Sequence, residues 1–232
     1  EAISNRCCYI GLKMNSFDRF LSYLHPIYVE VTKSEINPRI ELCIRKGRYI
    51  LNSSNANYSY HGLYELFKKF FRKVPMDWDR VDNVLVLGFG AGCVVPLIRG
   101  YNAECSIVGV EIDSKVIELA RNYFGIDEFR NTQVVHGDAV DYLARCRKAF
   151  DIIIVDIFID RDVPSAVESP EFIASLHNCL TPQGKVIFNK MAYNKKTKAE
   201  VEKVYSIYKE IFPMVTLYKF MITGRILVAS AN

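Results

Sequence analysis

The chain has 232 residues, half of them hydrophobic, and its 30 basic and 26 acidic residues give a net charge of +4. That length suits one domain of roughly 150–200 residues with a small additional unit. The mild, mixed charge gives no sign of nucleic-acid binding, and no apolar run approaches the ~20 residues that span a bilayer. Seven cysteines without a CxxC pair or metal-ligand spacing indicate free thiols in a reducing cytoplasm and no bound metal.

The first part of the chain predicts a small unit of its own. Its elements, in chain order, are a short amphipathic helix, three strands and a second helix, over 16–24, 27–31, 39–44, 48–51 and 61–72. The strands alternate in part and are joined by turn-like stretches, which indicates an antiparallel β-meander. We therefore expect residues 1–75 to form an N-terminal segment and residues 76–232 to form a separate α/β domain.

From residue 83 onward, strands alternate with helices. The apolar runs are too continuous for half-exposed strands and predict parallel strands covered on both faces; they are NVLVLG (83–88), CSIVGVE (105–111), TQVVHG (132–137), FDIIIVD (150–156) and KVIFN (185–189). The tail segments MVTLYKF and RILVAS predict an antiparallel pair added to the same sheet. This pattern is typical of a doubly wound, mostly parallel seven-stranded sheet, a fold that binds ligands at the carboxyl ends of its strands.

The helices between these strands have recognisable ends. Ser114 is expected to cap the helix that stops at Gly125. Ser169 and Pro170 open the helix SPEFIASLHNCL, since proline is favoured at the first helical position. A last helix, with a capping box made by Thr197 and Glu200, is expected to end before Pro213.

A glycine-rich loop follows the first strand of the α/β domain, in the sequence VLVLGFGAG. Gly88, Gly90 and Gly92 permit positive φ and allow a ligand to approach bare backbone. The dinucleotide fingerprint requires its third glycine or an alanine at position 93, where this chain has Cys93. The observed spacing is common in S-adenosylmethionine sites, and a nicotinamide dehydrogenase is correspondingly disfavoured.

Acidic residues stand at the ends of the next three strands. Glu111 ends the second strand, 19 residues after Gly92, where a carboxylate can accept hydrogen bonds from both ribose hydroxyls. Asp138 and Ala139 follow the third strand, and an acid there suits the exocyclic amine of adenine, although Asp138 can equally cap the next helix. Asp156 follows the fourth strand at the same edge. The ordered set is stronger evidence for a nucleoside site than any single member.

These residues resemble the class I S-adenosylmethionine-dependent transferases and, more narrowly, the spermidine synthase family. The resemblance covers roughly residues 27–190 and includes SYHGLYELF, VLVLGFGAG, GVEID, GDAVDYL and FDIIIVD. It implies a class I methyltransferase-type sheet and a nucleoside pocket made by Gly88, Gly90, Glu111, Asp138 and Ala139. It also implies a reaction centre at Asp156, with Tyr60 reaching in, His61 beside the substrate, and a homodimer.

The loop after the fourth strand departs from this family. Aminopropyltransferases carry Asp-Ser-Ser-Asp-Pro there, whereas this chain has Asp156-Ile-Phe-Ile-Asp160. Ile159 occupies the second acidic position. Asp160 or Asp162 is a candidate for replacing the missing acid, and Asp160 is a candidate for contacting the substrate. Gly62 stands where the family usually has an acid. These departures shift the expected reaction from polyamine synthesis toward methyl transfer.

Three functions therefore remain open. The first is an S-adenosylmethionine-dependent methyltransferase with a small or amine-bearing acceptor, in which Asp156 orients the amine and accepts its proton. The second is an aminopropyltransferase that uses decarboxylated S-adenosylmethionine. The third is a non-catalytic nucleoside-binding protein that acts through a partner.

Overall fold

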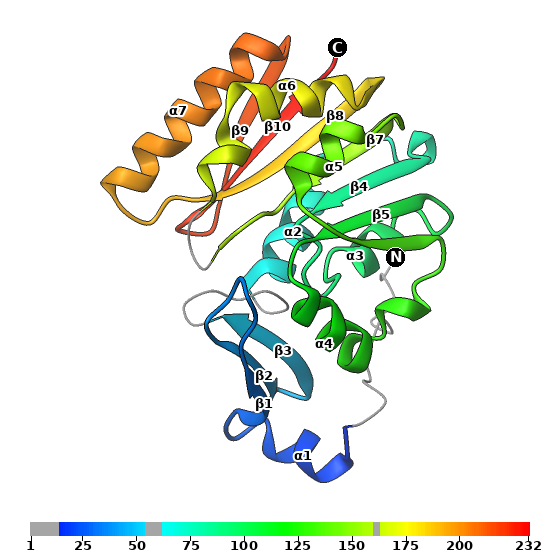
Figure 1. Cartoon of the computed structure of the whole chain (residues 1–232), viewed down its shortest axis with the longest axis vertical. Helices are drawn as coiled ribbons and strands as arrows, with labels where there is room; N and C mark the ends of the chain where they lie inside the picture. Colours follow the sequence, from blue (N-terminus) through cyan, green and yellow to red (C-terminus); the bar gives the residue numbers. More distant parts are fainter. Residues whose placement is uncertain (1–13, 54–61, 160–162) are drawn as a thin grey trace.

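A computed structural model describes residues 14–53, 62–159 and 163–232. The main sheet has the spatial strand order β6-β5-β4-β7-β8-β10-β9. The first five strands in that order are parallel, and β10 runs antiparallel to both neighbours. The predicted doubly wound sheet with an antiparallel tail is thus confirmed (Figure 1). The strands are β4 (Asn83–Leu87), β5 (Ser106–Glu111), β6 (Thr132–His136), β7 (Phe150–Val155), β8 (Leu180–Met191), β9 (Met214–Phe220) and β10 (Gly224–Ser230).

Helices cover both faces of this sheet, and side chains alternate between the two faces along each strand. Val84 and Val86 of β4 belong to the apolar core beneath α2, α3 and α4, whereas Leu85 and Leu87 belong to the core beneath α5, α6 and α7. Because both faces of the sheet are buried, the sequences of the central strands are unbroken apolar runs. The helices are α2 (Gly62–Lys73), α3 (Val95–Arg99), α4 (Ser114–Phe124), α5 (Ala139–Arg145), α6 (Pro170–Asn178) and α7 (Lys195–Ile211).

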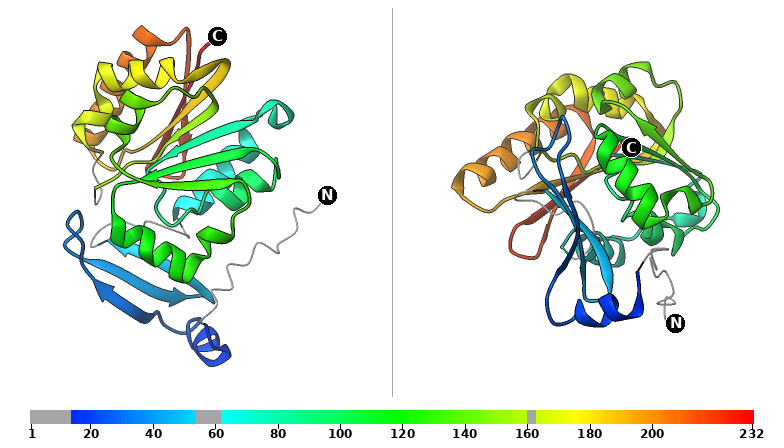
Figure 2. Two further views of the ribbon diagram at one scale, coloured as in Figure 1. Left: turned by 45° about the vertical axis from the view of Figure 1, so that its right-hand side comes forward. Right: turned by 60° about the horizontal axis from the view of Figure 1, so that its bottom comes forward.

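The N-terminal strands form the predicted antiparallel meander in the order β1-β2-β3. Figure 2 shows this small sheet lying beneath α4. Its buried Ile40 and Leu42 belong to the same apolar core as Val116 and Phe124 of α4. Packing against α4 therefore fixes the meander beside the edge of the main sheet at which β5 ends. The strands are β1 (Ile27–Thr32), β2 (Ile40–Arg45) and β3 (Arg48–Ser53).

A buried polar joint adds to this packing. The Asp113 carboxylate, only 2% exposed, accepts hydrogen bonds from Ser34 Oγ at 2.5 Å and Asn37 Nδ2 at 2.7 Å, both in the β1–β2 loop. Its other oxygen accepts the backbone N–H groups of Lys115 and Val116. One side chain thus caps α4 and fastens the β1–β2 loop to it.

Two helix caps differ from the sequence prediction. Asp113, rather than Ser114, caps α4, because its backbone is extended and its carboxylate reaches two orphan N–H groups of the first turn. The capping box of α7 pairs Asn194 with Thr197, so this helix starts at Lys195, before the expected Thr197 cap. Ser169 caps α6 as predicted, and Gly125 ends α4 in the left-handed conformation with φ +63°.

The first helix and the fifth strand differ in length from the prediction. Helix α1 (Ser16–Leu21) ends earlier than residue 24 and buries none of its residues, because Phe17 and Phe20 both point outward with 68% of their area exposed. Strand β8 is longer than the predicted 185–189 run and starts directly after α6. Its last residues, Asn189–Met191, therefore extend to the edge of the sheet where β7 ends.

Candidate active site

A cavity of about 600 Å³ opens at the carboxyl edge of the main sheet. Its walls come from the loops after β4, β5, β6 and β7, the end of β8, the β9–β10 turn, the first turns of α2 and the β1–β2 loop. We call the part lined by Gly90, Glu111, Gly137, Asp138 and Ala139 the nucleoside end. We call the apolar part the acceptor end; it is lined by Leu63, Leu66, Ile157, Phe158, Met191 and Met221.

The glycine loop lies where the two ends meet. Gly88 has φ +81°, and a Cβ on it would lie 2.3 Å from the backbone oxygen of Asp156. Only glycine permits both the positive φ and this close approach. Gly90 also has positive φ, at 55°, and its N–H faces the carboxylate of Glu111. Bare backbone is therefore held at the cavity wall beside the carboxyl end of β7.

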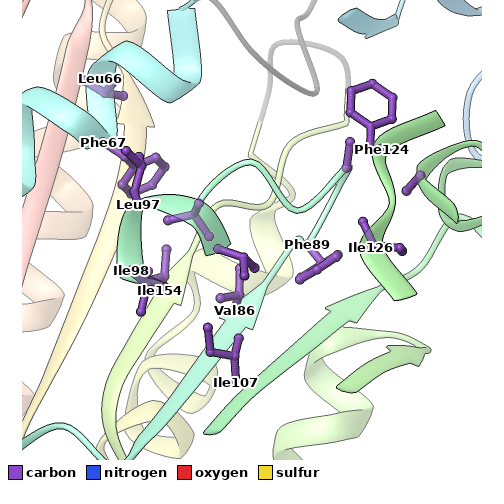
Figure 3. Close-up of a cluster of buried hydrophobic side chains, with 14 of the residues drawn as sticks. Leu66, Phe67, Val86, Phe89, Leu97, Ile98, Ile107, Phe124, Ile126 and Ile154 are labelled. Carbon is purple, nitrogen blue, oxygen red and sulfur yellow. The ribbon is translucent and has the colours of Figure 1, made fainter. Parts of the chain in front are cut away.

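Phe89, between these glycines, anchors the loop from below. Its ring is 3% exposed, and Figure 3 shows it among Val86, Ile107 and Ile126 in the core. It rests on Gly109 of β5, where an added Cβ would lie 2.0 Å from the ring. The sequence prediction missed this pair, although the glycine inside the apolar run IVGVE signals a close approach to backbone.

Glu111 lies between β5 and the glycine loop. Its side chain is only 7% exposed, and its two oxygens accept the N–H groups of Gly90 at 2.8 Å and Asp113 at 3.0 Å. Burial raises the pKa of this carboxyl, while the hydrogen bonds from Asp113 and Gly90 act in the opposite direction. A carboxylate has about four lone-pair sites, so Glu111 can brace the loop and still accept ribose hydroxyls.

Asp138 lies at the end of β6 and caps α5. Its Oδ1 accepts the N–H groups of Val140 at 2.7 Å and Asp141 at 3.1 Å. The capping role considered from the sequence is therefore present. Asp138 also lines the cavity together with the buried Ala139, which is compatible with contact to an adenine edge.

Asp156 stands after β7 at the junction of the two ends. Its Oδ1 accepts a hydrogen bond of 2.8 Å from Asn189 Nδ2 of β8. Desolvation raises the pKa of Asp156 to about 7, opposed by the Asn189 hydrogen bond and reinforced by the charge of Glu111. A carboxyl poised near neutrality can gain or lose a proton during a reaction at pH 7.

Asn189 was not predicted as a site residue. It is 2% exposed, and its amide oxygen has no hydrogen-bond partner among the residues that the structure describes. The signal for it was available, because Asn189 breaks the apolar run KVIFN at the carboxyl end of a strand. The same rule identified Asp156 one strand away.

A buried ion pair holds the segment that follows the β7 loop. Lys190, 3% exposed, pairs with Glu168 of the short 3₁₀ turn η3 (Ser165–Glu168) and lies 3.5 Å from Glu200 of α7. Burial raises the pKa of Glu168, opposed by its bond to Lys190. This contact ties η3, whose Val167 lines the cavity, to the sheet.

Not all of the predicted site residues fall within this cavity. Gly92 does not line it; a Cβ added to Gly92 would meet the rings of Phe89 and Phe129, so its positive φ shapes the loop. Tyr60, His61 and Asp160 lie outside the described residues. Gly88, Gly90, Glu111, Asp138, Ala139 and Asp156 are brought together as expected. Within the described ranges, no cluster of His, Cys, Asp or Glu could hold a metal ion, and no helix could cross a membrane.

The nucleoside end fits an S-adenosyl group by its chemistry. Gly88 and Gly90 expose backbone, Glu111 can accept from a diol, and Asp138 can accept from an exocyclic amine. Acidic side chains at the wall, Glu111, Asp113, Asp138 and Asp156, suit a cationic sulfonium. No Lys or Arg is among the described residues that line the cavity.

Comparison with known proteins gives relatives of two kinds. A probable polyamine aminopropyl transferase of Bifidobacterium longum is 33% identical over 48% of this chain and 24% of its own length. The eEF1A lysine and N-terminal methyltransferase homolog of Drosophila melanogaster is 26% identical over 61% of this chain and 22% of its own length. The chain spans less than half the length of the curated relatives that it matches first, 24% and 48%.

Solved structures show the same fold. The spermidine synthase of Thermotoga maritima matches with a TM-score of 0.71 at 20% identity, covering 89% of this chain and 73% of that one. Human methyltransferase-like protein 13 in complex with SAH matches with a TM-score of 0.57 at 24% identity, covering 72% and 78%. The family model described as the spermine/spermidine synthase domain matches residues 66–225. The relatives named above are transferases, and the solved structures show that the chain has a class I methyltransferase-type fold. By the match of the family model, the chain belongs to the spermine/spermidine synthase domain family.

Proposed function

We propose that this chain is a methyltransferase that uses S-adenosylmethionine and modifies an amine. The observation that carries the proposal is the position of Asp156, the single carboxylate that the described residues place between the nucleoside end and an otherwise uncharged acceptor end. One carboxylate is enough to orient one amine. A diamine acceptor would present a second ammonium, for which the described residues of the acceptor end offer no carboxylate.

The residues divide the work between binding and proton transfer. Gly88, Gly90, Glu111, Asp138 and Ala139 would hold the nucleoside. When bound, the sulfonium would supply an electrophilic methyl carbon to the amine lone pair, and the C–S electron pair would leave with sulfur as a neutral thioether. Asp156 orients the amine and takes its proton as the nitrogen becomes bonded to carbon. The apolar wall excludes water, and alignment of nucleophile and carbon supplies much of the rate.

Aminopropyl transfer is the second candidate. The name of the Bifidobacterium relative favours it, and so does the lack of Lys or Arg among the described lining residues. The decarboxylated donor has no carboxylate, so it needs no basic partner. The same Asp156 would then accept the proton from an amine that attacks the aminopropyl carbon.

Calorimetric titration with the two donors separates these candidates. The purified chain is titrated with S-adenosylmethionine and, separately, with its decarboxylated analogue, which differ by one carboxylate. Tighter binding of S-adenosylmethionine by tenfold, equivalent to about 1.4 kcal/mol, supports methyl transfer. A tenfold preference for the decarboxylated analogue contradicts it and supports aminopropyl transfer. Binding of neither compound at millimolar concentration contradicts both candidates.

A further inference from the structure

The wall of the acceptor end is apolar on several sides. Leu63 and Leu66 come from α2, Ile157 and Phe158 from the loop after β7, and Met191 and Met221 from the end of β8 and the β9–β10 turn. These elements are far apart in sequence, so the apolar surface is assembled by the fold rather than by one motif. Unbranched methionine side chains on two of its sides can adapt to ligands of different shape.

This apolar surface continues to the mouth of the cavity. Ile159, Tyr193 and Met221 line the cavity and keep 48%, 43% and 60% of their area exposed. Large apolar side chains that remain exposed around a concave site mark a surface that binds apolar matter. The entrance and the interior of the acceptor end are therefore both apolar.

Among the residues that the structure describes, one ionisable group carries the charge at this end. Asp156 is the only ionisable carboxyl or basic side chain that the described residues contribute to the acceptor end. A second ammonium on a ligand would lose its hydration there without gaining a charged partner among the described residues, which is costly. A methyl group in the same position would gain from leaving water.

We propose that the acceptor is a hydrophobic monoamine, whose nitrogen meets Asp156 and whose hydrocarbon body lies against Leu66, Phe158 and Met221. This inference rests on the proposed function, because it specifies the acceptor of that same reaction. It predicts that hydrocarbon length strengthens binding and that a second amine weakens it.

A matched pair of ligands tests the proposal directly. n-Pentylamine and putrescine have the same number of non-hydrogen atoms and differ by a terminal methyl against a terminal ammonium. Each is titrated into protein saturated with S-adenosylhomocysteine. n-Pentylamine should bind at least tenfold more tightly, and n-hexylamine should improve on it about three- to fourfold, the value of one buried methylene. Equal affinity, or tighter binding of putrescine, overturns the proposal.

A pair of variants places the effect at the acceptor end. Met221→Glu introduces a carboxylate at the cavity mouth, and Ile222→Glu introduces the same charge at a neighbouring residue that is 89% exposed and does not line the cavity. Met221→Glu should reduce the preference for n-pentylamine over putrescine at least fivefold, while Ile222→Glu should leave it unchanged. Equal effects of the two variants would mean that the preference does not arise at the acceptor end and would overturn the proposal.

Failure of the hydrophobic-monoamine proposal can be told apart from failure of the proposed function. Binding of S-adenosylhomocysteine is measured first, and its failure contradicts the proposed function alone. If that binding fails, n-pentylamine and putrescine are compared on the nucleoside-free protein. The amine that binds more tightly there still decides the acceptor class. Conversely, nucleoside binding together with a preference for putrescine overturns the hydrophobic monoamine and leaves sulfonium-dependent transfer standing.

Discussion

The two ends of the cavity are built in different ways. The nucleoside end is polar, formed by consecutive strand–loop units, and braced by backbone hydrogen bonds to Glu111 and Asp138. The acceptor end is apolar and assembled from α2, β8 and the β9–β10 turn, which lie far apart in the chain. The contrast fits the proposed function, in which rigid polar groups hold a constant nucleoside and the shape of apolar side chains selects the acceptor.

Removing the Asp156 carboxylate should have the largest effect, and it should affect the transfer rate far more than nucleoside affinity. Asp156→Asn keeps the size of the side chain but cannot accept a proton, so we expect transfer to fall by roughly 10²–10⁴-fold, the usual contribution of a general base. Nucleoside affinity should change less than threefold. The measurement pairs initial rates with calorimetry, and an active Asp156→Asn variant would contradict the assigned role.

The same substitution should increase stability in a defined pH window. The pKa of Asp156 is raised from 3.8 to about 7 by burial, so between these values the folded protein retains a proton that the unfolded chain has lost. The free energy of unfolding therefore falls as pH rises through this window. We expect Asp156→Asn to be more stable than the parent by roughly 1–3 kcal/mol at pH 8 and equal to it near pH 3.5. Denaturant titrations at both pH values check this.

Two glycines of the cavity wall should differ sharply on substitution. Gly88→Ala places a Cβ at 2.3 Å from the Asp156 oxygen at positive φ, whereas a Cβ on Gly137 meets nothing within 4 Å. We expect Gly88→Ala to lose about 3 kcal/mol or more of stability and Gly137→Ala to change by less than about 1 kcal/mol. Thermal unfolding of both variants measures the difference. Equal losses of stability in the two variants would contradict the contact assigned to Gly88.

Glu111→Gln should affect the nucleoside end alone. An amide in place of the carboxylate presents one accepting oxygen, so either the Gly90 N–H or the Asp113 N–H loses its acceptor, and the amide NH2 cannot accept from a ribose hydroxyl. We expect S-adenosylhomocysteine to bind about 10–100-fold more weakly, equivalent to roughly 1.4–2.8 kcal/mol. The amine preference of the acceptor end should stay unchanged, and a shift in it would mean that the two ends are coupled.

Asn189→Leu should have the smallest effect of these substitutions, and it should act on proton transfer through the pKa of Asp156. The Asn189 amide donates to Asp156 and favours its charged form, so its loss raises the pKa of Asp156 above about 7. The acid limb of the kcat/KM profile should move upward by about one pH unit. A uniform loss of rate without movement of that limb would show a purely structural role for Asn189.

Much of the nucleoside end could be predicted because its residues obey short local rules. Gly88, Glu111, Asp138 and Asp156 each follow an apolar run, and parallel strands bring their carboxyl ends to one edge. Asn189 also comes directly after an apolar run, but it lies inside β8, of which the prediction recognised only the part over 185–189. Met191 and Met221 have no comparable signal, because the β9–β10 turn reaches the cavity only through the antiparallel pairing of β10 with β8.

Helix caps show the same limit on a smaller scale. Sequence identifies a residue that can cap, such as Ser114, but Asp113 has the extended backbone from which a side chain reaches the first N–H groups. The competition between adjacent candidates is decided by where the strand β5 ends. The length of β8 was likewise decided by its pairing with β7 and β10.

The Asp113 joint has a consequence for how the molecule opens. The carboxylate that caps α4 also holds Ser34 and Asn37 of the β1–β2 loop, and Asn37 lines the cavity. Fraying of the first turn of α4 therefore loosens the loop, and release of the loop leaves the buried Oδ2 of Asp113 without its two donors. The two segments should behave as one cooperative unit in hydrogen exchange, with matching protection that rises together when a nucleoside binds.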